Sequence, residues 1–237
     1  ELQQQVGFFP GPSLDGCVIT RPACEAIQDG GAAGIPILAG ATRDEGTLLA
    51  PLFAVTEEVG RATIMGLATS VGRDDGAEYL EFLTDQMASD DVEFDDVVAQ
   101  MTRTWFDVFR ASALRVAATA SQHGAGGWVY NFEVPTDHPL GVTHYADVPF
   151  TFNWMEAGHP RLFVHPATDA HRELARLWSS TMVAFATRGS PNGQGLPQWP
   201  QYQPDSFSCL RVTAQPEIVD NPDGDDMLRL YKVLSSD

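Results

Sequence analysis

Two short apolar runs, each followed by a loop with an ionisable side chain, are the features that most constrain the fold of this chain. The first run, residues 35–39, leads into the turn 40–46, which carries two adjacent acids. The second run, residues 128–134, leads into a loop that contains His144. Short apolar runs bounded by turn residues are typical of strands buried in a parallel sheet. An acid and a histidine, each just past the carboxyl end of a strand, are groups from which a hydrolytic site can be built.

The rest of the chain alternates between helical patterns and weaker strands. Apolar spacing predicts four helices and two short strands, followed by a final short helix: the helices over residues 56–70, 76–88, 95–122 and 169–187, the strands over 209–213 and 216–219. Residues 6–34 are rich in turn signals and are expected to be loop. The order of strand, long helical insertion, strand and helix predicts the α/β class, with helices covering a mostly parallel sheet.

The domain organisation is inferred from the absence of internal boundaries and from the small number of core strands. Residues 1–237 contain no internal repeat, linker or low-complexity tract, and are expected to form one structural unit. Only two of the predicted strands belong clearly to a core, and a two-stranded parallel sheet cannot bury both of its faces. We therefore expect the chain to be the C-terminal portion of a single domain, with an N-terminal half outside this sequence.

The charge balance excludes some partners. The chain has 14 Lys and Arg against 32 Asp and Glu, a formal net charge of −18. Such a surface argues against nucleic acid, whose phosphates a basic protein neutralises, and against anionic membrane surfaces. No run of about 18 apolar residues occurs, so no membrane span is expected. Scarce lysine beside abundant alanine, glycine and arginine is typical of a GC-rich bacterial gene.

Ester hydrolysis by a serine requires a base and an acid, and this requirement identifies the candidate residues. A serine nucleophile requires a base that takes the hydroxyl proton and a carboxylate that orients this base. His144 is the candidate base, in a loop where Gly141 allows close approach. Asp44 and Glu45 are both candidate acids, and their spacing does not choose between them. Taken singly, a loop histidine and an acid at a helix start also have purely structural roles. The other histidines are expected at surfaces or helix ends: His123, His138, His159, His165 and His171.

Neither a nucleophile nor a metal site is evident in the sequence. No Gly-x-Ser-x-Gly segment occurs. The acidic stretch 220–226 suggests a calcium loop, but aligning Gly224 with the central glycine puts Val219 and Leu230 where carboxylates are required. We therefore expect no metal and no cofactor.

Several motifs, taken in order, resemble a known family. They are weak singly and run along nearly the whole chain: Phe9-Pro10 with Asp15-Gly16, the run 35–40 with Asp44-Glu45-Gly46, Gly141-x-x-His144-x-x-Asp147-Val148-Pro149-Phe150-x-Phe152, Trp178 with Phe185-Ala186, Gly189-Ser190-Pro191-Asn192, and Trp199-Pro200-x-Tyr202. In these motifs the chain is similar to the C-terminal half of type-B carboxylesterases, the carboxylesterase/lipase group that includes bacterial para-nitrobenzyl esterases and cholinesterases.

This resemblance implies an α/β-hydrolase fold and a Ser-Glu-His mechanism, with Glu45 as the acid and His144 as the base. It selects Glu45 over Asp44. It also places the nucleophilic serine in the N-terminal half, so the present chain alone would be inactive. Two positions depart from the family: Tyr145 stands where glycine is usual, and Thr42 where asparagine is frequent. A tyrosine beside the base would narrow the acyl or alcohol pocket.

The predicted function is carboxylic ester hydrolysis, and the predicted partners are a small-molecule ester and the N-terminal half of the same enzyme. Carbamate or amide hydrolysis uses the same acyl-enzyme chemistry and stays open. A non-catalytic, cholinesterase-like binding module also stays open, although retention of both the acid and the base favours an enzyme. Three aromatic residues in the long helix are either core or site wall: Trp105, Phe106 and Phe109.

Overall fold

A four-stranded sheet forms the centre of the molecule, with the strand order β1-β2-β3-β4. This computed structural model describes residues 14–21, 23–53, 56–71, 77–90, 96–155, 167–203 and 205–235 of the 237. The strands are β1 (Ile37–Thr42), β2 (Gly127–Phe132), β3 (Ser208–Val212) and β4 (Glu217–Asp220). The first three run parallel, and β4 is antiparallel to β3. The predicted α/β class with a mostly parallel sheet is confirmed.

Helices flank this sheet. Their bounds are α2 (Ala23–Ala26), α3 (Glu45–Phe53), α4 (Glu57–Val71), α5 (Ala77–Ser89), α6 (Val97–Gln122), α7 (Val148–Thr151), α8 (Asp169–Arg188) and α9 (Gly224–Ser235). The predicted helices α4, α5, α6 and α8 are confirmed, as is a helix in the tail. In the part of the chain that the structure describes, no helix is both long and apolar enough to cross a bilayer.

Three helical segments differ from the sequence expectation. The prediction of loop over residues 6–34 is wrong at Ala23–Gly31, where α2 continues into a short π-helical turn. Helix α3 was not among the predicted helices, and α7 lies in the segment expected to be the histidine loop. Helix α3 contains Gly46 and Pro51, both poor helix formers, so its local sequence concealed it.

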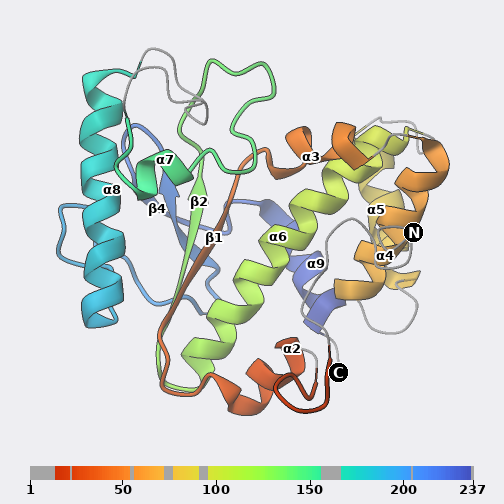
Figure 1. Cartoon of the computed structure of the whole chain (residues 1–237), viewed down its shortest axis with the longest axis horizontal. Helices are drawn as coiled ribbons and strands as arrows, with labels where there is room; N and C mark the ends of the chain where they lie inside the picture. The colour runs from red at the N-terminus through yellow and green to blue at the C-terminus, as the bar shows by residue number, and fades with distance from the viewer. Residues whose placement is uncertain are drawn as a thin grey trace.

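One face of the sheet is an aromatic layer beneath α8. Side chains alternate along a strand, so Trp128, Tyr130 and Phe132 of β2 share a face. Trp178 of α8 packs there, with its ring centroid 4.9 Å from that of Tyr130 and 6.4 Å from that of Phe132. Figure 1 shows α8 alongside the sheet, on the side away from α6. Leu174, Trp178 and Thr181 of α8 are buried.

Helix α6 packs directly on the opposite face of the sheet (Figure 1). Two glycines allow close approach to α6, Gly127 from the sheet and Gly46 from α3. A β carbon on Gly127 would lie 2.0 Å from the carbonyl oxygen of Ala117, and one on Gly46 would lie 1.9 Å from that of Thr102. Helices α3, α4 and α9 contact α6 as well. Helix α6 is therefore held between the sheet and the other helices.

Candidate active site

The predicted acid and base meet at the carboxyl ends of β1 and β2. Thr42, the last residue of β1, is in register with Phe132, the last residue of β2, so the segments that follow start side by side. Glu45 is the first residue of α3, and His144 lies in the loop after β2. The Oε2 atom of Glu45 lies 2.5 Å from Nδ1 of His144. The structure therefore brings together two side chains that are 99 positions apart.

Both Glu45 oxygens have donors. Oε1 accepts a hydrogen bond of 2.7 Å from the backbone N–H of Thr42, and Oε2 faces the imidazole. The Glu45 side chain is 6% exposed and that of His144 is 22% exposed. A carboxylate in the first turn of a helix is also favoured by the helix dipole. These contacts fix the carboxylate in one orientation toward the histidine.

The contact with Glu45 assigns the roles of the two imidazole nitrogens. A carboxylate accepts hydrogen bonds, so in the neutral ring Nδ1 carries the proton and Nε2 has a free lone pair. Among the described residues, no group forms a hydrogen bond with Nε2 of His144. A histidine in this state can take a proton from a hydroxyl group placed beside Nε2.

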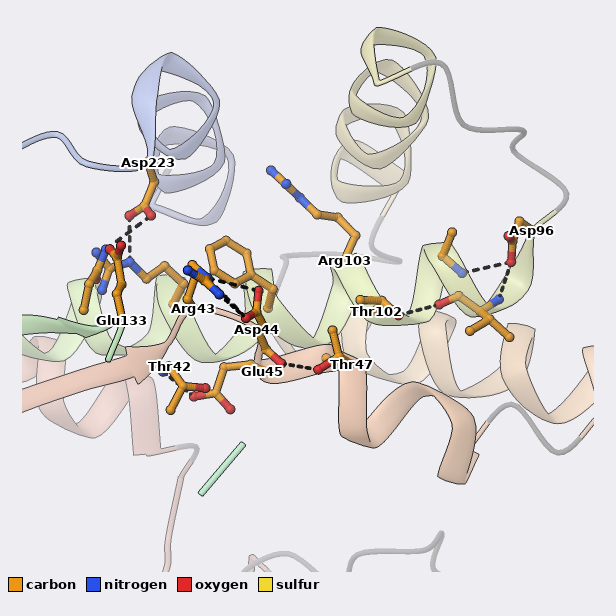
Figure 2. A pocket seen from close by; sticks show the side chains of 16 residues that line it. Thr42, Arg43, Asp44, Glu45, Thr47, Asp96, Thr102, Arg103, Glu133 and Asp223 are labelled. Carbon is orange, nitrogen blue, oxygen red and sulfur yellow. Dashed lines mark hydrogen bonds and ion pairs between the residues drawn. The ribbon is translucent and has the colours of Figure 1, made fainter. Parts of the chain in front are cut away.

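Asp44, the neighbouring acid, faces a different set of groups. Its Oδ2 accepts a 2.7 Å hydrogen bond from the backbone N–H of Val142, and its own N–H donates to the Val142 carbonyl at 3.0 Å. Oδ2 also pairs with Arg43 at 3.0 Å. Figure 2 shows Asp44 against Arg43, while the Glu45 carboxylate lies beside Thr42. Asp44 thus binds backbone and arginine rather than the imidazole.

Further contacts hold the histidine loop against the segment after β1. The hydroxyl of Thr47 donates to the carbonyl of Leu140 at 2.8 Å. Gly141 has φ 78°, and a β carbon there would lie 2.3 Å from Asp44 Oδ2, so only glycine fits. The loop that carries the base is therefore shaped by side chains of the other segment.

A partly buried pair of side chains joins the histidine loop to β2. The hydroxyl of Tyr130 on β2 donates to Oδ2 of Asp147, three residues after His144, at 2.9 Å. Burial raises the pKa of Asp147, the Tyr130 hydrogen bond lowers it, and the nearby charge of Glu45 raises it. Sequence reasoning quoted Asp147 within a motif but assigned it no role. The alternation that sends Tyr130 toward the α8 face was the one signal for this pair.

Two aromatic rings contact the imidazole of His144. The ring of Phe109, on α6, stacks on that of His144 with centroids 4.9 Å apart and planes at 28°. The ring of Tyr145 lies edge-on at 4.3 Å and 61°. Trp105 stacks on Phe109 at 5.5 Å and is buried in the core. Of the aromatic residues predicted as core or wall, Trp105 is core, and Phe109 joins that core to the His144 ring.

A cavity of about 510 Å³ lies behind the acid, between the end of β1 and α6. It is lined in part by Arg43, Arg103 and Glu133, and its lining does not include His144 (Figure 2). Arg110, buried in its wall, pairs with Asp223 at 2.7 Å and donates to the Tyr130 carbonyl at 3.0 Å. This cavity therefore does not reach the imidazole of His144.

The other candidate residues have structural surroundings. His123 caps α6 and contacts the Gln28 carbonyl at 3.0 Å, and His171 closes a capping box on α8. His159 and His165 lie outside the described residues, as do Phe9 and Pro10 of the first motif. In the acidic stretch 220–226, Asp223 is committed to Arg110. Within the described residues, no group of three or more ionisable side chains could hold a metal ion.

Comparison with known proteins identifies relatives along almost the whole chain. The carboxylesterase family model matches residues 1–228. Para-nitrobenzyl esterase of Bacillus subtilis (strain 168) is 26% identical over 232 residues, which cover 94% of this chain and 43% of that protein. Phenmedipham hydrolase of Pseudarthrobacter oxydans is 26% identical over 204 residues, covering 85% of this chain and 40% of that protein. The chain thus spans less than half the length of these relatives.

Solved structures show the same similarity. A PNB esterase superposes with a TM-score of 0.70 at 22% identity, covering 92% of this chain and 43% of the other. The carboxylesterase EST55 of Geobacillus stearothermophilus superposes with a TM-score of 0.68 at 25% identity, covering 97% of this chain and 48% of the other. These neighbours have the α/β-hydrolase fold, which confirms the predicted fold. Because the family model matches residues 1–228 of the 237, the chain belongs to the carboxylesterase family.

Proposed function

We propose that this chain supplies the acid and the base of a serine carboxylesterase, with Glu45 as the acid and His144 as the base. The observation that carries the proposal is the 2.5 Å contact between Glu45 Oε2 and His144 Nδ1. The nucleophilic serine would come from an N-terminal segment outside this sequence. Two facts support that part: the chain has no Gly-x-Ser-x-Gly segment, and it spans less than half of its relatives.

In this mechanism Nε2 of His144 takes the proton of the serine hydroxyl as its oxygen attacks the ester carbonyl. The imidazolium that forms is stabilised by the Glu45 carboxylate, which also keeps the ring in the required tautomer. Nε2 then gives the proton to the leaving alcohol, and an acyl-enzyme remains. Water releases the acid by the same steps, with His144 again as the base.

The substrate class rests on the relatives. Para-nitrobenzyl esterase and fumonisin B1 esterase carry names that state an ester bond, and both match this chain. We therefore propose a small-molecule carboxylic ester as the substrate of the complete enzyme.

The test is His144→Ala in the complete protein, including the segment that precedes Glu1. Turnover of an activated ester is expected to fall by roughly 10³-fold or more, with little change in stability. His171→Ala is the matched control, because His171 caps α8 and does not face Glu45; turnover is expected to stay within a few-fold of wild type. Near-normal turnover of His144→Ala would overturn the assignment.

A further inference from the structure

Tyr145, which directly follows the base, has a strained backbone. Its φ is 73°, in the left-handed region. There the β carbon of an L-residue crowds the following carbonyl, and a bulky side chain in this region is a genuine outlier. Glycine adopts the same conformation without this strain. The protein therefore keeps an aromatic side chain where the backbone alone would favour glycine.

Burial of the Tyr145 side chain does not explain this strain. The residue is 54% exposed. Its ring instead touches the imidazole of His144, with centroids 4.3 Å apart. Strained residues persist where surrounding structure requires them, and they cluster at functional sites.

The imidazole needs a second constraint, because Glu45 supplies only one. The ring is attached at Cβ. Among the described residues, its one hydrogen bond is the one between Nδ1 and Glu45. A single hydrogen bond tolerates a range of distances and angles, so small coupled changes of the two side-chain torsions can still rock the ring plane. Such rocking would move Nε2, the atom that takes the proton.

Two aromatic contacts oppose this rocking. Phe109 stacks on the imidazole at 4.9 Å, and Trp105 stacks on Phe109 from the buried side of α6. Tyr145 adds an edge-on contact from the loop. The base is thus in contact with one ring on a rigid helix and one ring on a strained turn.

We propose that Tyr145 is a positioning residue, whose ring acts with Phe109 to fix the plane of the His144 imidazole and hence the direction of Nε2. This inference rests on the proposed function, since it requires His144 to be the base.

The test compares Tyr145→Gly with Tyr145→Phe in the complete enzyme, using the small activated ester para-nitrophenyl acetate. Tyr145→Gly removes the ring and the strain, so kcat is expected to fall roughly three- to tenfold, with KM unchanged and the melting temperature equal or higher. Tyr145→Phe restores kcat, because the ring is kept. Asn153→Gly is the matched control: it relieves a positive φ of 50° near the same loop, at a residue outside the site.

Two results would overturn the inference. One is a wild-type kcat for Tyr145→Gly. The other is a change confined to KM for the bulkier para-nitrophenyl butyrate, which would make Tyr145 only a wall of the pocket. His144→Ala in the same assay separates the two proposals. If it is inactive while Tyr145→Gly is normal, only the positioning role fails; if it stays active, the proposed function itself fails.

Discussion

The segments after β1 and β2 reach the same site by different means. After β1, the acid comes three residues past the strand end, as the first residue of α3. After β2, the chain runs from Phe132 through residues 133–147, all of them described, with no helix before α7, and His144 lies within this stretch. Backbone geometry thus places Glu45, whereas His144 lies in an irregular loop.

That loop takes its shape from the first segment. Asp44 binds the backbone of Val142 as both donor and acceptor, and Thr47 binds the carbonyl of Leu140. The two adjacent acids therefore have separate contacts: Glu45 faces the imidazole, and Asp44 holds the loop that carries it.

The largest effect is expected for Glu45→Gln. The amide keeps the shape of the side chain but leaves the imidazolium without its counter-charge, so kcat of the complete enzyme should fall roughly 10³- to 10⁴-fold. Asp44→Asn is the adjacent control and should act mainly on stability. Steady-state kinetics of both variants measure the difference, and a greater loss of kcat in Asp44→Asn would reverse the two roles.

A smaller effect is expected for Asp44→Ala, which removes the acceptor of the Val142 N–H. A backbone amide left without its partner should lower the free energy of unfolding by about 1–2 kcal/mol, since water reaches this partly exposed site. Denaturant unfolding of the complete protein measures the change. Asp90→Ala, at an exposed position, is the control. Equal stability of the two variants would show that Asp44 does not hold the loop.

The smallest effect is expected for Tyr130→Phe, which removes the hydroxyl that donates to Asp147. The loss should be about 1 kcal/mol of unfolding free energy. This loss of unfolding free energy should also depend on pH. Burial already raises the pKa of Asp147, and losing the Tyr130 donor raises it further. A carboxyl whose folded pKa is raised loses stability as pH rises above its unfolded pKa.

Unfolding of Tyr130→Phe should therefore show a larger deficit near neutral pH than at about pH 4. Denaturant curves at the two pH values measure this difference. A deficit that is the same at both would mean that Asp147 does not become charged in the loop.

The elements that could be predicted from the sequence are those with a distinct apolar composition or a regular spacing of apolar residues. The apolar run after residue 35 and the β-rich segment near Trp128 have the composition of buried strands, and α6 and α8 have long helical stripes. Helix α3 could not be predicted, because Gly46 and Pro51 lower its local propensity. It forms because Gly46 lets it approach the backbone of α6, which is a tertiary contact.

The site was predictable only in part. Spacing did not choose between Asp44 and Glu45, and the family resemblance did. The contacts that shape the loop join residues about a hundred positions apart, such as Asp44 with Val142, and no local pattern encodes them. The conformation of Tyr145 is also set by the folded loop, because its type gives no signal of a positive φ.

The two glycine contacts of α6 also bear on how relatives of this protein vary in length. Gly46 abuts Thr102 near one end of the helix, and Gly127 abuts Ala117 near the other. One residue inserted between these points would turn the rest of the helix by about 100°. A side chain would then face the strand backbone at Gly127, or Phe109 would turn away from the base. The number of residues in this span is therefore expected to be constant among homologous genes, and insertions and deletions should collect outside it.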